Sequence, residues 1–195
     1  MYPLVEREPQ SVKVFAVIHL VFSGIGFLWG LYLAIAPLFT RAMLESFSRS
    51  VPAEQRASFD ASMAMQEKTG WVGALSGAFM LILAVMLLIA GIKLLRRRAD
   101  GLAWSNTYAW TSIATKLVSL TLTAIFILPA QREMMQTQFQ NMPGGASSGL
   151  GSAGQAFGTA AGIFTLVCII LGCTYPILSL CLLNKPEVKS WLGVK

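Results

Sequence analysis

Three polar side chains in this sequence lie within long apolar runs and are the residues best suited to chemistry: His19, Lys116 and Tyr175. A lysine ammonium in hydrocarbon needs hydrogen-bond acceptors, and an ionisable residue at such a position is a functional hypothesis by default. Pro176 lacks a backbone N–H, so in a helix the carbonyl of Gly172 loses its usual donor. That carbonyl, the Tyr175 hydroxyl and neutral His19 are candidate acceptors. The sequence thus predicts an intramembrane polar cluster of His19, Lys116 and Tyr175.

Lys116 also has a simpler interpretation. At 1.5 Å per residue it lies about 12 Å deeper than Tyr108, and helical side chains lean toward the N-terminus of their own helix. A four-carbon stem can then carry the ammonium back to the lipid headgroups. Both interpretations stay open, and Lys116→Met separates them, because loss of assembly would favour the cluster.

Catalytic motifs in this chain lack their partners. Residues 145–149 match G-x-S-x-G, but no apolar strand precedes them, and the only histidine, His19, lies in another run. The apolar runs contain no Asp or Glu, so nucleophilic and acid–base chemistry lack their usual groups. We therefore expect no enzyme activity and no cofactor.

Methionine is common outside the apolar runs. Thioethers are soft ligands that select Cu(I), yet no His or Cys lies on that side to complete a site. The three cysteines all fall in the last run and are expected to act as small hydrophobic residues. No metal site is predicted, and outward-facing copper handling remains a third option for function. The methionines concerned are Met43, Met63, Met65, Met134, Met135 and Met142.

Four apolar runs must position these residues, at about 14–39, 70–95, 105–129 and 157–183. Roughly 20 apolar residues in a helix cross a bilayer, and backbone amides in lipid must bond internally. The composition agrees, with 55% hydrophobic and 12% charged residues, against about 25% charged in soluble domains. We predict an all-α integral membrane four-helix bundle with antiparallel neighbours, forming a single domain over residues 1–195.

Small residues recur at seven-residue steps in each run. Without a hydrophobic driving force between helices in lipid, small residues allow close backbone contact, and a seven-residue period predicts left-handed packing. Such packing leaves little room for a water-filled cavity, and the missing carboxylates disfavour an ion-driven transporter. The residues expected at helix contacts are Ser23, Gly30, Gly77, Ala84, Gly91, Ser112, Ser119, Gly158 and Gly172.

Two segments outside the runs are predicted to be helical. Residues 40–69 have the spacing of a short helical hairpin, and residues 129–142 of one further helix. A glycine- and serine-rich stretch at 143–154 is typical of a flexible tether. The apolar side chains of these segments form the expected partner surface: Phe39, Met43, Phe47, Phe59, Met63, Met135 and Phe139.

The net charge of +6 is explained by topology rather than by nucleic-acid binding, because the basic residues lie at the ends of the runs. If the N-terminus is cytoplasmic, nine basic residues fall inside and five outside. The inner ones are Arg7, Lys13, Lys93, Arg96, Arg97, Arg98, Lys185, Lys189 and Lys195. The positive-inside rule therefore predicts cytoplasmic N- and C-termini in a cell inner (plasma) membrane.

The leading functional hypothesis is a non-enzymatic accessory or scaffold subunit of a larger membrane protein assembly. Its partners would be the lipid bilayer and other membrane subunits or further copies of itself, contacted through the spans and the Met- and Phe-bearing outer segments. The alternative is a small oligomeric transporter or channel that uses His19, Lys116 and Tyr175 as a polar element.

Overall fold

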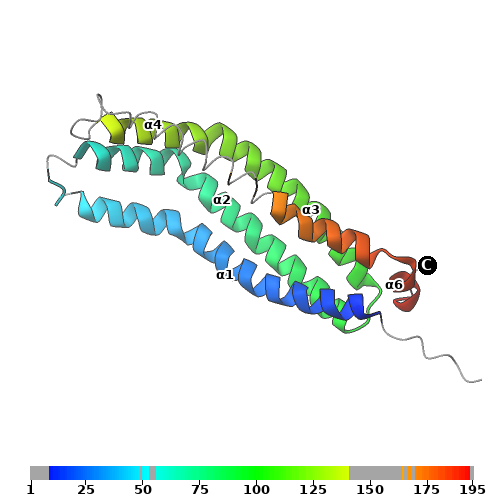
Figure 1. Ribbon diagram of the computed structural model, residues 1–195. Helices are drawn as coiled ribbons and strands as arrows, with labels where there is room; N and C mark the ends of the chain where they lie inside the picture. The colour runs from blue at the N-terminus through cyan, green and yellow to red at the C-terminus, as the bar shows by residue number, and fades with distance from the viewer. Residues whose placement is uncertain are drawn as a thin grey trace, which may run out of the picture. The chain divides into compact units, whose positions relative to one another are not determined.

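The computed structural model of this protein is all-helical in the part that it describes, which confirms the all-α part of the prediction (Figure 1). It describes residues 9–48, 50–52, 56–140, 164, 167 and 170–193, without the side chains of 57, 58 and 137–140. A helix at Ile170–Leu183 precedes α6. The other elements are α1 (Gln10–Phe47), α2 (Arg56–Leu95), α3 (Asp100–Leu122), the π-helical segment η2 (Thr123–Ile127), α4 (Leu128–Gln140) and α6 (Pro186–Trp191).

Three helical stretches are long and apolar enough to cross a membrane: Gln10–Phe47, Phe59–Leu95 and Asp100–Gln136. A helix of 38 residues is about 57 Å long, nearly twice the ~30 Å hydrocarbon thickness. Each stretch therefore extends well beyond any single bilayer core. The predicted fourth span, 157–183, falls partly outside the described residues, and its second half is the apolar helix Ile170–Leu183.

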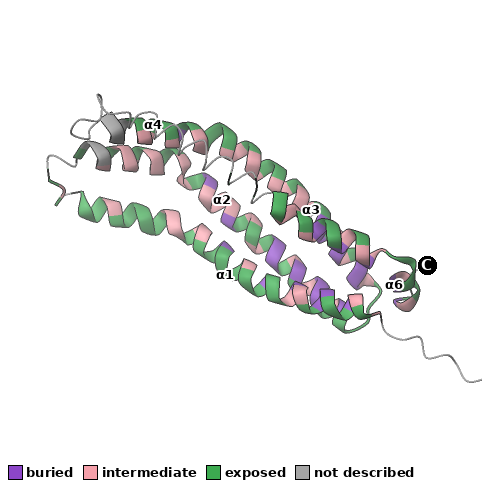
Figure 2. Ribbon diagram, viewed as in Figure 1, coloured by how far each residue is buried: buried purple, intermediate pink, exposed green. Residues whose placement is uncertain are grey.

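The chain divides into two compact units. Unit 1 comprises Met1–Gly30, Phe79–Lys116 and Leu171–Lys195, and unit 2 comprises Leu31–Ala78 and Leu117–Ile170. The buried residues of α1 all lie between Val12 and Gly30, and the opposite end of this helix shows no buried residue in Figure 2.

A hydrophobic cluster in unit 1 joins the first turns of α1, the end of α2, the start of α3 and α6. Pro186 at the first turn of α6 is well placed, because its missing N–H is one that a helix start leaves unused. The same cluster holds the end of the Ile170–Leu183 helix, so five helix ends share one core. Its buried members are Val12, Phe15, Ala16, Leu94, Leu102, Leu183, Val188 and Leu192.

The turn from α2 to α3 is a Schellman motif. Arg98 N donates to the Lys93 carbonyl at 3.0 Å and Arg97 N to the Leu94 carbonyl at 3.1 Å. Arg97 takes the left-handed position of this motif, with φ 55°, where glycine is usual. Gly101 is required for the return of the chain, because a Cβ there would lie 2.9 Å from the backbone N of Leu94.

The small residues of the seven-residue series lie mostly inside. Ser23, Gly30, Gly77, Ala84, Gly91 and Ser112 are buried, Ser119 and Gly172 are half-buried, and Gly158 lies outside the described residues. A Cβ on Gly91 would sit 3.1 Å from the Ala16 carbonyl oxygen and 3.1 Å from His19 Cβ. Within unit 1, α1 and α2 therefore approach each other almost backbone to backbone at this point.

In unit 2, α1 and α2 meet around Pro37. Gln66 Nε2 donates to the Pro37 carbonyl at 3.2 Å, and a Cβ on Gly73 would lie 3.4 Å from the Pro37 ring. The predicted hairpin at 40–69 is formed by continuations of the two long helices, α1 running to Phe47 and α2 starting at Arg56. Helix α1 carries an exposed ion pair at 2.7 Å, Arg41 with Glu45, one turn apart.

The segment η2 interrupts the helix that runs from α3 into α4. The Leu128 N–H donates to the Thr123 carbonyl, five residues back, which is the π-helical pattern. Pro129 follows and has no N–H to give, so the carbonyls of this turn cannot all bond in the α pattern.

Candidate functional site

A chain of four hydrogen-bonded side chains runs through the interior of unit 1. His19 of α1 is fully buried, with Nε2 3.0 Å from Ser105 Oγ of α3. Its Nδ1 lies 2.6 Å from the Tyr175 hydroxyl on the Ile170–Leu183 helix. Ser105 Oγ in turn lies 3.0 Å from Ser179 Oγ on that same helix. Tyr175, His19, Ser105 and Ser179 thus link three helices through side-chain hydrogen bonds alone.

The imidazole can be satisfied in either tautomer. Neutral histidine offers one donor and one acceptor, while each hydroxyl both donates and accepts. If Tyr175 donates to Nδ1, then Nε2–H donates to Ser105; in the other tautomer Nδ1–H donates to Tyr175 and Ser105 donates to Nε2. A buried polar group without a hydrogen bond carries a large desolvation cost. Because these four side chains are hydrogen-bonded to one another, they stabilise the packed interior.

Aromatic rings surround the imidazole. Tyr175 stacks on Phe15 with centroids 6.2 Å apart and meets the edge of Phe22 at 4.7 Å. Tyr108 lies 6.1 Å from the His19 ring, centroid to centroid. These rings place an apolar wall around the polar chain.

The ammonium of Lys116 donates to the carbonyl of Gly172, which is the carbonyl that Pro176 leaves without its helical donor. A Cβ on Gly172 would lie 3.3 Å from Lys116 Nζ, so a glycine permits this approach. Within the described part of the chain, no hydrogen bond joins Lys116 to His19 or Tyr175. Of the three residues predicted to cluster, the structure brings His19 and Tyr175 into contact. Lys116 binds the helix that carries Tyr175, but at Gly172, three residues earlier in the chain.

Ser105 and Ser179 complete the polar chain, and sequence reasoning did not assign them as partners of His19. The only signal was spacing: Ser105 lies seven residues before Ser112 and Ser179 seven after Gly172, a pattern that fits helix packing equally well. An amide pair was also missed. Asn106 and Asn184 exchange hydrogen bonds of 3.2 and 2.8 Å between α3 and the end of the Ile170–Leu183 helix.

Charged and aromatic side chains gather at the end of unit 1 that carries α6. Lys93 Nζ lies 2.7 Å from Asp100 Oδ2 and 4.9 Å from the centre of the Trp104 ring. The hydrogen bond from Lys93, together with the charges of Lys93 and Arg98, holds the pKa of Asp100 below its ordinary value. The Arg97 guanidinium lies over Trp191 of α6, 5.0 Å from the ring centre.

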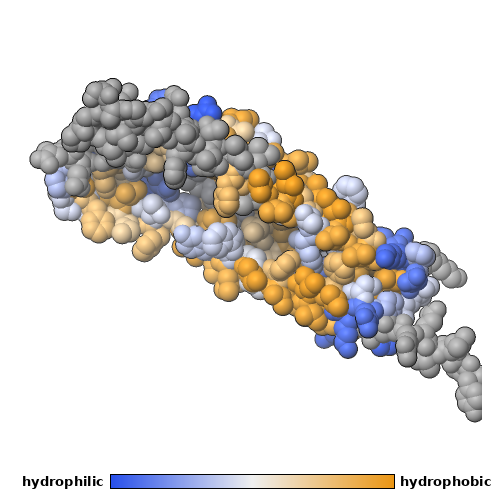
Figure 3. Space-filling model, viewed as in Figure 1, coloured by the Kyte–Doolittle hydropathy of each residue, from blue (hydrophilic) through white to orange (hydrophobic). Residues whose placement is uncertain are grey.

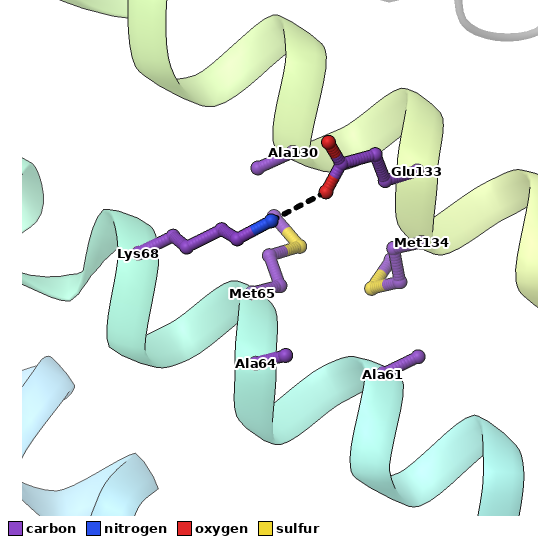
Figure 4. Close-up of a pocket in the computed structure, with 7 residues that line it drawn as sticks. All are labelled: Ala61, Ala64, Met65, Lys68, Ala130, Glu133 and Met134. Carbon is purple, nitrogen blue, oxygen red and sulfur yellow. Dashed lines mark hydrogen bonds and ion pairs between the residues drawn. The ribbon is translucent and has the colours of Figure 1, made fainter.

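Unit 2 contains a cavity of about 110 Å³ between α2 and α4 (Figure 4). Met65 and Met134 point into the space between these helices, and an ion pair of 2.6 Å from Lys68 to Glu133 crosses it. The remaining lining residues are alanines: Ala61, Ala64 and Ala130. The described residues contain no group of three or more His, Cys, Asp or Glu side chains able to hold a metal ion.

The predicted partner surface is distributed unevenly. Phe39, Met43 and Phe47 of α1 are exposed, whereas Phe59, Met63 and Met135 are half-buried. The side chain of Phe139 lies outside the described residues.

Comparison with known proteins gives no match: no family model, no curated protein and no solved structure resembles this chain.

Proposed function

We propose that this chain is a multi-pass membrane protein that serves as a non-enzymatic accessory or scaffold subunit of a larger membrane assembly. In this proposal four antiparallel spans form a bundle in the cell inner membrane, with both termini in the cytoplasm. Three apolar helices of sufficient length support the membrane location, and the distribution of Lys and Arg supports the orientation.

The observation that carries the accessory role is the closed state of the polar interior of unit 1. Tyr175, His19, Ser105 and Ser179 form hydrogen bonds with one another. The Lys116 ammonium donates to a backbone carbonyl. A catalytic or binding site normally leaves polar groups directed at an open pocket. Here the same groups join helices to one another, which is a structural use.

The outward surface supplies the contact area for such a role. Large apolar side chains are exposed along most of α1, among them Leu28 at 70%, Leu38 at 70% and Phe39 at 69%. Figure 3 shows apolar side chains covering much of the visible face of the helices. Since α1 continues beyond the length that lipid can cover, residues such as Phe39 and Phe47 favour a protein partner at its far end.

Affinity purification of the tagged chain at native expression level, in a mild detergent and after a short in-cell cross-link, tests this proposal. We expect one or a few membrane proteins to co-purify in fixed stoichiometry. Phe39→Ser/Met43→Ser/Phe47→Ser should reduce that yield. The control is Leu28→Ala/Ile35→Ala, which changes exposed residues in the apolar part of α1 and should leave the yield unchanged. A clean monomer from both wild type and variants would contradict the accessory role.

A transporter or channel is the second candidate, favoured by the continuity of the Tyr175–His19–Ser105–Ser179 hydrogen bonds, along which a proton can be passed between neighbouring groups. Flux through purified protein in liposomes, lost in His19→Phe and in Lys116→Met, would support it.

Copper handling ranks third and rests on Met65 and Met134 in the cavity of unit 2. Saturable Cu(I) binding lost in Met65→Leu/Met134→Leu would support that option.

A further inference from the structure

The end of unit 1 that carries α6 is strongly basic among the described residues. It holds seven Lys and Arg side chains and only two acids, Asp100 and Glu187. Asp100 is already engaged by Lys93 at 2.7 Å and lies 3.5 Å from Arg98. The bases are Lys13, Lys93, Arg96, Arg97, Arg98, Lys185 and Lys189.

These bases belong to one surface because one hydrophobic cluster fixes the segments that carry them. Lys13 follows buried Val12, the three arginines follow buried Leu94, and Lys185 and Lys189 flank buried Val188. Val12, Leu94 and Val188 are members of the same cluster. We call this surface, formed by the seven bases, the basic end, and Figure 3 shows hydrophilic side chains gathered there.

The basic end is held in a defined shape. Arg97 is fixed in the left-handed backbone position by the Schellman motif and lies over the Trp191 ring. Arg96 and Arg98 on either side of it are exposed. The ring of Trp104, on α3, packs against the ammonium of Lys93, on α2. Indole rings beside Lys and Arg are typical of side chains at the level of lipid headgroups.

We propose that the basic end binds the phosphate groups of anionic phospholipids, such as phosphatidylglycerol, in the adjoining leaflet. The inference rests on the membrane location in the proposed function, but not on the accessory role. Charge complementarity selects this partner, because guanidinium groups pair with phosphate through paired N–H donors and bases near a membrane surface attract anionic lipid. The attraction is electrostatic at an exposed surface, so it should weaken as salt is raised.

Native mass spectrometry of the full-length protein, released from mixed micelles that contain equal phosphatidylglycerol and phosphatidylcholine, tests the inference. Wild type should retain phosphatidylglycerol preferentially. Arg96→Gln/Arg97→Gln/Arg98→Gln should reduce that preference by about tenfold or more. A matched control removes three bases of unit 2, as Arg41→Gln/Arg56→Gln/Arg132→Gln, and should leave the preference unchanged.

Two outcomes would overturn the inference: wild type without preference, or equal losses in the two triple variants. If the first variant fails to fold, Lys185→Gln/Lys189→Gln provides an independent reduction of the same surface and should lower the preference by a smaller factor. Retention in carbonate-washed membranes is measured in parallel. Retention without lipid preference refutes this inference alone, whereas loss of retention in wild type refutes the membrane location itself.

Discussion

The fully buried histidine of α1 decides what the interior of unit 1 can do. His19 has a hydroxyl at each ring nitrogen, Tyr175 at 2.6 Å and Ser105 at 3.0 Å. Ser105 passes its second hydrogen bond to Ser179. Both imidazole nitrogens are hydrogen-bonded within the protein, so His19, one of the three polar residues singled out in the sequence, joins three helices.

Gly91 of α2 lies next to His19, where α1 and α2 approach each other almost backbone to backbone. Gly91→Val places methyl groups where a Cβ alone already lies 3.1 Å from the Ala16 carbonyl and His19. Overpacking of this kind costs about 1–3 kcal/mol, so we expect a lower midpoint of thermal unfolding in detergent. Tryptophan fluorescence during heating measures the midpoint.

Gly24→Val is the matched control for this substitution, since no described atom of another helix lies within 4 Å of the Cβ position at Gly24 on α1. It should unfold within a degree or two of wild type. Equal destabilisation by both variants would show that valine acts through helix propensity or lipid contact and not through the α1–α2 approach.

At the scale of the element, the sequence predicts those helices whose formation depends on composition. It does not predict those whose formation depends on a particular contact. The long uncharged runs predicted long apolar helices, because backbone that lies within lipid must form its hydrogen bonds internally. The i,i+4 spacing of Arg41 and Glu45 predicted a helical arm after Pro37, and the structure forms this arm as a continuation of α1.

Segments η2 and α6 were not predicted, for different reasons. A π turn depends on how carbonyls before Pro129 redistribute their bonds, which periodicity does not reveal. Helix α6 has only six residues, too few for a pattern. Its formation depends on burial of Val188 and Leu192 against residues distant in sequence. In the same way, the Tyr175–His19–Ser105–Ser179 chain required knowledge of which helix faces meet.

Docking of α6 leads to a prediction at this scale. Val188 is 1% exposed, so Val188→Asp buries an unpaired carboxylate unless α6 leaves the cluster. We expect α6 to detach and trypsin to cleave after Lys189 several times faster in detergent, as followed by mass spectrometry. Glu187→Asp on the exposed side of α6 is the control and should cleave like wild type. Unchanged cleavage of Val188→Asp would show that α6 does not depend on this cluster.

At the scale of the whole molecule, the account depends on how many times the chain crosses the bilayer. Three helices are long and apolar enough by length and composition. The fourth span is a proposal that rests on the apolar run at 157–183, of which the structure describes mainly Ile170–Leu183. An even number of crossings places α6 and the α2–α3 turn on the same side, as the basic end requires.

Cysteine labelling in intact cells tests this central claim most directly. The three native cysteines are first replaced by alanine, and single cysteines are introduced as Ser48→Cys, Ala99→Cys and Ser190→Cys. With a membrane-impermeant maleimide, we predict that position 48 reacts in intact cells, whereas positions 99 and 190 react only after permeabilisation. Reaction of position 190 from outside would leave three crossings, separate α6 from the arginine turn and contradict both the four-span topology and the basic end.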